Sequence, residues 1–326
     1  MNQLYPIRFR PILKDMIWGG SKLRKIFGKP GATDKSGESW EISDVKNNSS
    51  VVENGFLAGN TLGEIAEIYM GDLLGDKVYE RFGQQFPLLI KYIDANDKLS
   101  IQVHPDDKMA YEKHKSYGKS EMWYVVQAEP GAKLIVGFNK TIDADTCLQH
   151  LNSNTLPEIL NFEDVKAGDV FYLPAGRIHA IGEGLLIAEI QQTSDITYRI
   201  FDWNRTDAQG KPRELHTELA LQAIDFSPVK DFKTSYKNKL NHTVELVKCE
   251  YFTTNLIELD QTLEKDYESI DSFVIYMCIE GQVIVKPYDQ DSITIKAGET
   301  ILIPAVLKNI IIEPLTTTKI LEVYID

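Results

Sequence analysis

Gln102 and His104 lie two positions apart in the segment 99–107, which reads LSIQVHPDD. On a β-strand, side chains at positions i and i+2 point to the same face. The apolar run 86–93 just before it is strand-like, and Pro105 ends the second strand. An amide and an imidazole are therefore expected to point together into the space that the sheet encloses.

Two further candidate ligands follow along the chain, Glu121 in the segment GKSEMWY and His179 in the segment LPAGRIHA. With Gln102 and His104 they make a mixed set of nitrogen and oxygen donors, which suits a borderline divalent metal with open coordination positions. The other four histidines lie in polar or helical contexts and are expected to be structural or exposed: His114, His150, His216 and His242.

Two lysines near these candidates admit two readings each. Lys91 interrupts an apolar strand, so its side chain points either to water or inward, where it would be a buried cation that needs an anion. Lys119 precedes Glu121 by two residues, so the two share a strand face unless Lys119 is an ordinary turn lysine.

Arg199 lies in the β-like run ITYRIF, where an unpaired arginine would be costly. Several polar neighbours could equally cap helices and brace loops, namely Asp106, Asp107, Asp202 and Arg205. The four tryptophans are expected in the core or in a pocket wall: Trp18, Trp40, Trp123 and Trp203.

The composition is that of a soluble globular protein, with 326 residues, 43% hydrophobic and 25% charged. The net charge of −13 argues against nucleic-acid and anionic-membrane binding, which both need a basic surface. No apolar run approaches the roughly 20 residues that span a bilayer, and residues 1–8 lack the features of a signal peptide. Three scattered cysteines form no metal or disulfide pattern, so a cytoplasmic setting is expected.

Short strand-like segments dominate the chain, which indicates a mainly β fold. A helix is expected over 61–75, where Thr61 and Glu64 can form a capping box. Further helices are expected over 106–114, 144–151, 156–160 and 214–224. The polar segment 225–234 is expected to hold a domain boundary.

An internal repeat supports two related β units. Residues 165–175 (VKAGDVFYLPA) match residues 295–305 (IKAGETILIPA), and each copy indicates a strand, a glycine turn, a second strand and a terminating proline. The same alignment places Asn309 at the position equivalent to His179. The second unit keeps the turn without the histidine, which favours a functional role for His179.

The pattern around residues 165–180 is a cupin signature, and the flanking blocks resemble the short bacterial form of the type I mannose-6-phosphate isomerases. The blocks that carry the resemblance are 18–20 (WGG), 37–43 (GESWEIS), 99–106 (LSIQVHPD), 118–123 (GKSEMW), 173–180 (LPAGRIHA) and 189–203 (EIQQTSDITYRIFDW). The resemblance implies two cupin-like double-stranded β units with a few short helices. A catalytic domain with helical insertions would occupy residues 1–228, and a C-terminal unit without metal ligands residues 229–326.

The resemblance also implies roles for individual residues. Zinc, one ion per chain, would be bound by Gln102, His104, Glu121 and His179. Arg199 would lie near the reacting carbons, with Lys119 and Glu189 as further catalytic residues. Glu189 is a candidate base if burial raises its pKa toward neutrality, with Lys119 or a metal-bound water as alternatives. The remaining expected substrate contacts are Lys91, Ser100 and Trp18.

The expected activity is metal-dependent interconversion of mannose 6-phosphate and fructose 6-phosphate through a cis-enediol, in a monomer or homodimer. An iron dioxygenase of the cupin class is a second reading, against which the amide Gln102 in a ligand position weighs. A non-catalytic sugar-binding cupin is a third, but it would be expected to lack ligands or Arg199.

Overall fold

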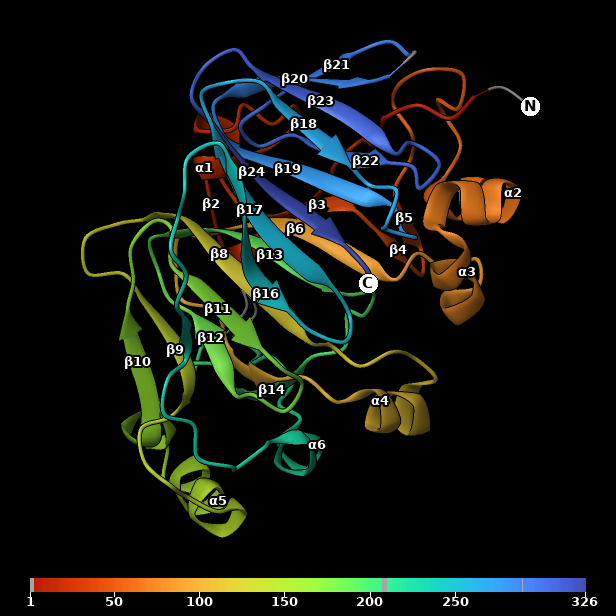
Figure 1. Ribbon diagram of the computed structural model, residues 1–326. Coiled ribbons are helices and arrows are strands. Elements are labelled where there is room, and N and C mark those ends of the chain that lie inside the picture. The colour runs from red at the N-terminus through yellow and green to blue at the C-terminus, as the bar shows by residue number, and fades with distance from the viewer. Residues whose placement is uncertain (1–2, 207–209, 289) are drawn as a thin grey trace.

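A computed structural model describes residues 3–206, 210–288 and 290–326. Two β units, each made of two facing sheets, lie against each other, and short helices extend from their edges (Figure 1). The predicted mainly β, cupin-like fold is confirmed. In the described ranges, no helix is long and apolar enough to cross a membrane.

The first unit has a seven-stranded and a five-stranded sheet. The larger sheet contains β2 (Ile12–Gly20), β3 (Ser36–Ile42), β6 (Leu88–Ala95), β8 (Glu121–Ala128), β11 (Val170–Leu173), β13 (Leu185–Gln192) and β15 (Lys233–Thr234). The smaller sheet contains β7 (Ile101–Val103), β9 (Lys133–Phe138), β10 (Leu160–Asp164), β12 (His179–Ile181) and β14 (Tyr198–Phe201). Side chains from both sheets, among them Ile93, Trp123 and Leu134, form the apolar core between them.

The second unit has a six-stranded and a four-stranded sheet. The first contains β1 (Ile7–Arg8), β16 (His242–Lys248), β17 (Thr253–Leu259), β19 (Val274–Glu280), β22 (Thr300–Ile303) and β24 (Thr318–Tyr324). The second contains β18 (Leu263–Asp266), β20 (Gln282–Pro287), β21 (Ile293–Lys296) and β23 (Asn309–Pro314). A small ribbon of β4 (Asp44–Val45) and β5 (Asn48–Ser49) completes the strands named here.

Two short strands, β1 and β15, show where the chain passes between the two units. Strand β1 pairs with β22 of the second unit, and β15 pairs with β11 of the first. The domain boundary at residue 228 stays a prediction.

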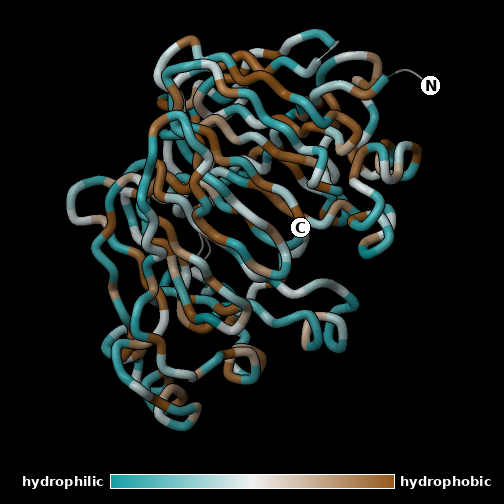
Figure 2. The backbone as a smooth tube through the Cα atoms, viewed as in Figure 1, coloured by the Kyte–Doolittle hydropathy of each residue, from teal (hydrophilic) through white to brown (hydrophobic). Residues whose placement is uncertain are grey.

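The outer face of the seven-stranded sheet packs on the six-stranded sheet. Ile90 and Tyr92 of β6 join Ile275 and Leu321 of the second unit in one buried cluster, and the Tyr92 hydroxyl donates to the carbonyl of Cys278 at 3.0 Å. Strand β6 is consequently buried on both faces. Figure 2 shows the apolar strands concentrated where the sheets stack, with polar segments at the loops. The second unit thus covers a hydrophobic face of the first.

Most helix predictions are confirmed. The helices α2 (Leu62–Leu74), α4 (Asp107–His114), α5 (Ala144–Asn152) and the 3₁₀ helix η1 (Leu156–Ile159) lie where the sequence indicates them. Thr61 and Glu64 form the expected capping box. The chain kinks at Met70, whose φ is +45°.

Three helical features differ from the sequence predictions. Helix α6 (Thr217–Ala223) begins later than residue 214, because the amide of His216 donates to the carbonyl of Arg199 and holds the preceding segment extended beside β14. The sequence did not indicate α1 (Lys22–Lys25), which is only one turn long. The sequence did not indicate α3 (Asp76–Phe82) either. The backbone amides of its first two residues donate hydrogen bonds to the carboxylate of Asp271, which is distant in sequence.

The repeated motif has the same local structure in both units. Gly168 and Gly298 turn the chain with φ of +89° and +88°, a conformation that glycine adopts without steric cost. The strands β11 and β22 follow at equivalent positions, and β12 and β23 begin at His179 and Asn309. The fold therefore repeats the turn, and only the first unit carries histidine beyond it.

Candidate metal centre and active-site cavity

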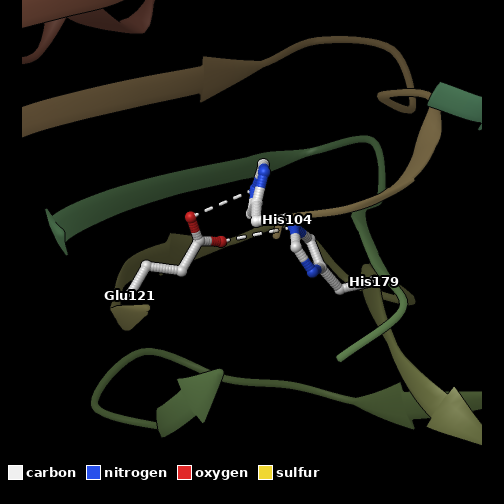
Figure 3. A group of neighbouring side chains, drawn as sticks. All are labelled: His104, Glu121 and His179. Atoms are coloured by element: carbon white, nitrogen blue, oxygen red, sulfur yellow. Dashed lines mark ion pairs between the residues drawn. The ribbon is translucent and has the colours of Figure 1, made fainter. Parts of the chain in front are cut away.

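Three of the four predicted ligands meet in the interior of the first unit. His104 directly follows β7, Glu121 begins β8 and His179 begins β12, so the facing sheets bring them together. Their candidate ligand atoms lie within 4.8 Å of one another, and all three residues are buried. Glu121 Oε2 lies 3.4 Å from Nε2 of His104, and Oε1 lies 3.3 Å from Nε2 of His179 (Figure 3).

Backbone carbonyls orient both imidazoles toward the cluster. Nδ1 of His104 lies 2.8 Å from the carbonyl of Ile196, and Nδ1 of His179 lies 2.8 Å from that of Arg177. Because a carbonyl only accepts, each Nδ1 carries the proton and each Nε2 presents a lone pair. A carbonyl partner on the outer nitrogen is the usual arrangement for a metal-binding histidine.

The protonation states also suit a cation. Burial lowers the pKa of His179 to about 4, and burial with the nearby charge of Lys119 holds the pKa of His104 well below its usual range. Both rings are thus neutral at pH 7 and available as ligands. Two lone pairs and a carboxylate converge in a buried space, and Glu121 Oε1 has no hydrogen-bond donor. A metal ion would satisfy all these groups.

Lys119 supplies a positive charge directly beside the cluster. Its ammonium donates to Glu121 Oε2 at 2.8 Å and to Nε2 of His104 at 2.9 Å. Lys119 lies just before β8, and its side chain points to the same side as that of Glu121. Burial raises the pKa of Glu121, and the charge of Lys119 opposes that rise.

Gln102 lies at the edge of the same cluster. Its side-chain Nε2 is 3.3 Å from Nε2 of His179, and its backbone pairs with His179 across β7 and β12. Rotation of the amide about its last side-chain bond turns the oxygen toward the three other groups, and an amide oxygen is an acceptable ligand for a divalent metal.

A cavity of about 450 Å³ adjoins the cluster. All six predicted residues other than the metal ligands line it, together with Gln102: Trp18, Lys91, Ser100, Lys119, Glu189 and Arg199. A cavity of this size, with a few convergent polar groups, suits a small ligand.

Lys91 and Glu189 form a buried ion pair in this cavity. Their charged atoms lie 3.1 Å apart, and the carboxylate also accepts from the Trp123 indole at 2.9 Å. Lys91 is 6% exposed, so it is the inward-pointing cation with an anionic partner rather than a solvent-facing lysine.

Glu189 is a candidate base on the condition that burial raises its pKa toward neutrality, and this pairing means that the condition is not met. Burial, the largest single effect, does raise it. Attraction to Lys91 and Lys119 and the hydrogen bond from Trp123 together outweigh burial, so the pKa of Glu189 lies below its ordinary value of 4.5.

Arg199 lies directly beside the candidate ligands. Its backbone pairs with Gln102 across β14 and β7, and its guanidinium donates to the Ser100 hydroxyl at 3.3 Å and to the carbonyl of Glu214 at 3.0 Å. Partial burial lowers the pKa of Arg199, but a guanidinium stays charged at neutral pH. Its charge therefore faces the cavity without a carboxylate partner within 4.0 Å among the described residues.

Several cavity residues were not predicted from the sequence: Lys14, Met16, Glu38, Asn48, Asp195, Thr197 and Arg213. Strand alternation could have found two of them, because Lys14 and Met16 share a face with Trp18. The others depend on contacts between distant segments.

Some polar residues near the site have structural roles rather than roles in the site. Asp106 caps α4 through the amide of Met109, and Asp202 braces a loop by pairing with Arg205 and Arg213. His114 hydrogen-bonds Tyr198 rather than the metal cluster.

Family models match two parts of the chain. Residues 7–128 match "Phosphomannose isomerase type I, catalytic domain", and residues 242–324 match "Mannose-6-phosphate isomerase, cupin domain". The two matched segments correspond to much of the first unit and nearly all of the second.

Mannose-6-phosphate isomerases from two bacteria are similar over most of the chain. "Mannose-6-phosphate isomerase ManA" of Bacillus subtilis is 35% identical over 85% of this chain and 86% of its own. The mannose-6-phosphate isomerase of Streptococcus mutans is 33% identical, over 93% of this chain and 94% of its own. The crystal structure of the Bacillus subtilis mannose 6-phosphate isomerase superposes with a TM-score of 0.88 at 32% identity, covering 99% of this chain and all of that one. The chain therefore belongs to the type I phosphomannose isomerases, and it is an isomerase.

Proposed function

We propose that this protein interconverts mannose 6-phosphate and fructose 6-phosphate with a zinc ion at the cluster of Gln102, His104, Glu121 and His179. The observation that carries the proposal is the convergence of two carbonyl-oriented imidazoles on a buried carboxylate. The relatives named as mannose-6-phosphate isomerases support the choice of substrate.

The donor set fits zinc. Imidazole nitrogen and carboxylate oxygen are usual zinc ligands, and a catalytic site keeps a position open. When bound, the ion supplies Lewis-acid polarisation of the sugar oxygens. Gln102 and two neutral histidines add no negative charge, so they leave the ion more electrophilic than an all-carboxylate site would.

In this proposal Arg199 stabilises the charge that develops during the reaction. Moving a proton between the first and second carbons creates an enediol, with negative charge building on an oxygen. A guanidinium held by Ser100 and by the Glu214 carbonyl is preorganised to donate to that oxygen.

Glu189 and Lys119 are the proposed proton-handling groups. Glu189 is ionised, as a base must be, although its low pKa makes it a weak base in the free enzyme. A substrate that draws Lys91 away from Glu189 would raise the pKa of Glu189 and strengthen it as a base. Lys119, with its ammonium beside the cluster, donates to the substrate oxygen.

The test is a coupled isomerase assay on the purified protein with and without a chelator, together with metal analysis. We expect turnover of mannose 6-phosphate, its loss on chelation and its recovery with zinc. Bound iron with oxygen consumption would favour the dioxygenase reading instead. A protein that binds sugar without turnover would favour the non-catalytic reading.

We also propose a cytoplasmic location. Cys147, Cys249 and Cys278 are free thiols, as expected in a reducing compartment.

A further inference from the structure

Five cationic side chains line the active-site cavity within the described part of the chain: Lys14, Lys91, Lys119, Arg199 and Arg213. Three of them are already paired with carboxylates. Lys91 pairs with Glu189 and Lys119 with Glu121, while Nε of Arg213 donates to Asp202 at 2.7 Å. The fourth, Arg199, lies beside Gln102 at the end of the cavity where the metal cluster lies.

Lys14 has only neutral partners. Its ammonium donates to Oδ1 of Asn48 at 2.5 Å and lies 4.6 Å from the centre of the Trp40 ring. No carboxylate lies within 4.0 Å of it among residues 3–206, 210–288 and 290–326. Its cross-strand neighbour Glu38 instead accepts from the Trp40 indole at 2.6 Å and lies 3.9 Å from Lys91.

Strand register places Lys14 at the end of the cavity far from the metal cluster. In one row across the larger sheet, Trp123 lies opposite Glu189, Glu189 opposite Lys91, and Lys91 opposite Trp40. Strand β2, which carries Lys14, pairs with β3 beyond Trp40. Near Lys14, β3 lies between β6 and β2, so four strand spacings of about 4.8 Å separate this part of β2 from β8, where the ligand Glu121 lies.

Trp40 connects this far end to the middle of the cavity. The ammonium of Lys91 lies 5.1 Å from the Trp40 ring, and that of Lys14 lies 4.6 Å from the same ring. A ligand that extends from the metal cluster past Lys91 would thus reach Lys14 within one cavity.

We propose that Lys14, with Asn48 and Trp40, forms the subsite for the phosphate group of the substrate, an inference that rests on the proposed function. The reacting carbons of a hexose 6-phosphate lie at one end of the molecule and the phosphate at the other. The metal cluster and Arg199 hold the reacting end, so the phosphate reaches the opposite end of the cavity.

The chemistry of this end suits a phosphate. A lysine ammonium binds phosphate as a point charge, and the amide oxygen of Asn48 holds that ammonium in place. The protein as a whole carries a charge of −13, so an anionic group needs a local cation without its own counter-ion. Lys14 meets that requirement, because its partners are an amide and a ring.

The experiment compares wild type with Lys14→Met in the isomerase assay, with inorganic phosphate as a competitive inhibitor. We expect the KM for mannose 6-phosphate and the inhibition constant of phosphate both to rise about ten- to hundred-fold, the loss typical of a charged hydrogen bond. The kcat and the bound metal should change little. Lys14→Arg should retain most of the binding, and Lys25→Met, an exposed lysine of α1 outside the cavity, should match wild type.

Calorimetric titration of the purified protein with inorganic phosphate separates this inference from the proposed function, because it needs no turnover. Weaker phosphate binding in Lys14→Met supports the subsite even if wild type fails to turn over mannose 6-phosphate. Equal phosphate binding by wild type and Lys14→Met would overturn it. So would an unchanged KM in an active Lys14→Met enzyme, or loss of phosphate binding in Arg213→Gln but not in Lys14→Met.

Discussion

The residues of the candidate metal centre depend on contacts with the surrounding backbone. The carbonyls of Ile196 and Arg177 set the proton positions of His104 and His179, and burial keeps both rings neutral. A ligand change should therefore act on metal binding first, whereas a change at Arg199 should act on the chemical step.

His104→Ala is expected to lose both bound metal and turnover, because only Glu121 and His179 of the buried trio would remain. Metal analysis and the isomerase assay measure the two effects. His242→Ala, at an exposed histidine on β16, is the matched control. Full metal content with near wild-type turnover in His104→Ala would contradict the ligand assignment.

Arg199→Ala is expected to lower kcat about 10²- to 10³-fold, the usual loss when a preorganised donor to a developing oxyanion is removed. Bound metal should stay at the wild-type level, because Arg199 contacts Ser100 and a backbone carbonyl rather than a metal ligand side chain. Arg24→Ala, at an exposed arginine of α1, controls for loss of positive charge. Loss of metal from Arg199→Ala would indicate a structural arginine instead.

Glu189→Gln is expected to destabilise the protein in a pH-dependent way. Because the pKa of Glu189 is depressed in the folded state, its ionised form stabilises the fold above its ordinary pKa of 4.5, and this stabilisation is lost as pH falls toward the folded-state value. The difference in free energy of unfolding between wild type and Glu189→Gln should thus be largest near pH 7 and shrink below about pH 4.5. Denaturant titrations at several pH values measure it, and a constant difference would argue against the Lys91–Glu189 pairing.

At the scale of elements, strand alternation places the site. Lys91 and Ile93 of β6 face the cavity, while Ile90 and Tyr92 face the second unit. Two-sided burial of this kind makes register essential, because a slip of one residue would exchange the two faces. The helices lie at the edges of the sheets and contribute stability rather than cavity residues.

Thr61→Ala is expected to lower the free energy of unfolding by about 1 kcal/mol, because it removes the N-cap of α2. The isomerase kcat should not change, since Thr61 does not line the cavity. Thermal or denaturant unfolding measures the loss, and Thr61→Ser should restore most of it. A large fall in kcat with normal stability would mean that α2 has a functional role.

At the scale of the whole molecule, the two units share one buried apolar cluster. Phe273 of the second unit packs against Phe86 of the first with ring centres 4.6 Å apart, and its amide donates to the carbonyl of Leu74. Strands β1 and β15 also cross between the units. The units are therefore expected to unfold together.

Phe273→Ala is expected to lower the free energy of unfolding by about 3–5 kcal/mol, as other truncations of buried aromatic side chains do. All four tryptophans lie between residues 18 and 203, so tryptophan fluorescence reports on the first unit alone. In Phe273→Ala, the unfolding midpoint measured by tryptophan fluorescence should nevertheless fall together with the midpoint measured by circular dichroism. Phe273→Leu should lower both midpoints less. An unchanged fluorescence midpoint beside a lowered circular-dichroism midpoint would show that the units unfold independently.

The sequence by itself determined the chemistry that the site can hold. The two-residue spacings of Gln102 with His104 and of Lys119 with Glu121 predict that each pair points to one side of the chain, because alternation is a local property of extended backbone. The repeated glycine turn likewise specified two similar units, and the capping box specified the start of α2.

Only the tertiary structure decided the charge states of the buried groups and which residues line the far end of the cavity. Whether Lys91 faced water or an anion depended on Glu189, which a neighbouring strand brings to it, and the same ion pair lowers the pKa of Glu189. Lys14 has no local signal beyond its alternation with Trp18, and its neutral partners come from β3 and β5. Electrostatic roles depend on burial and on neighbours distant in sequence, so they follow from the fold rather than from residue spacing.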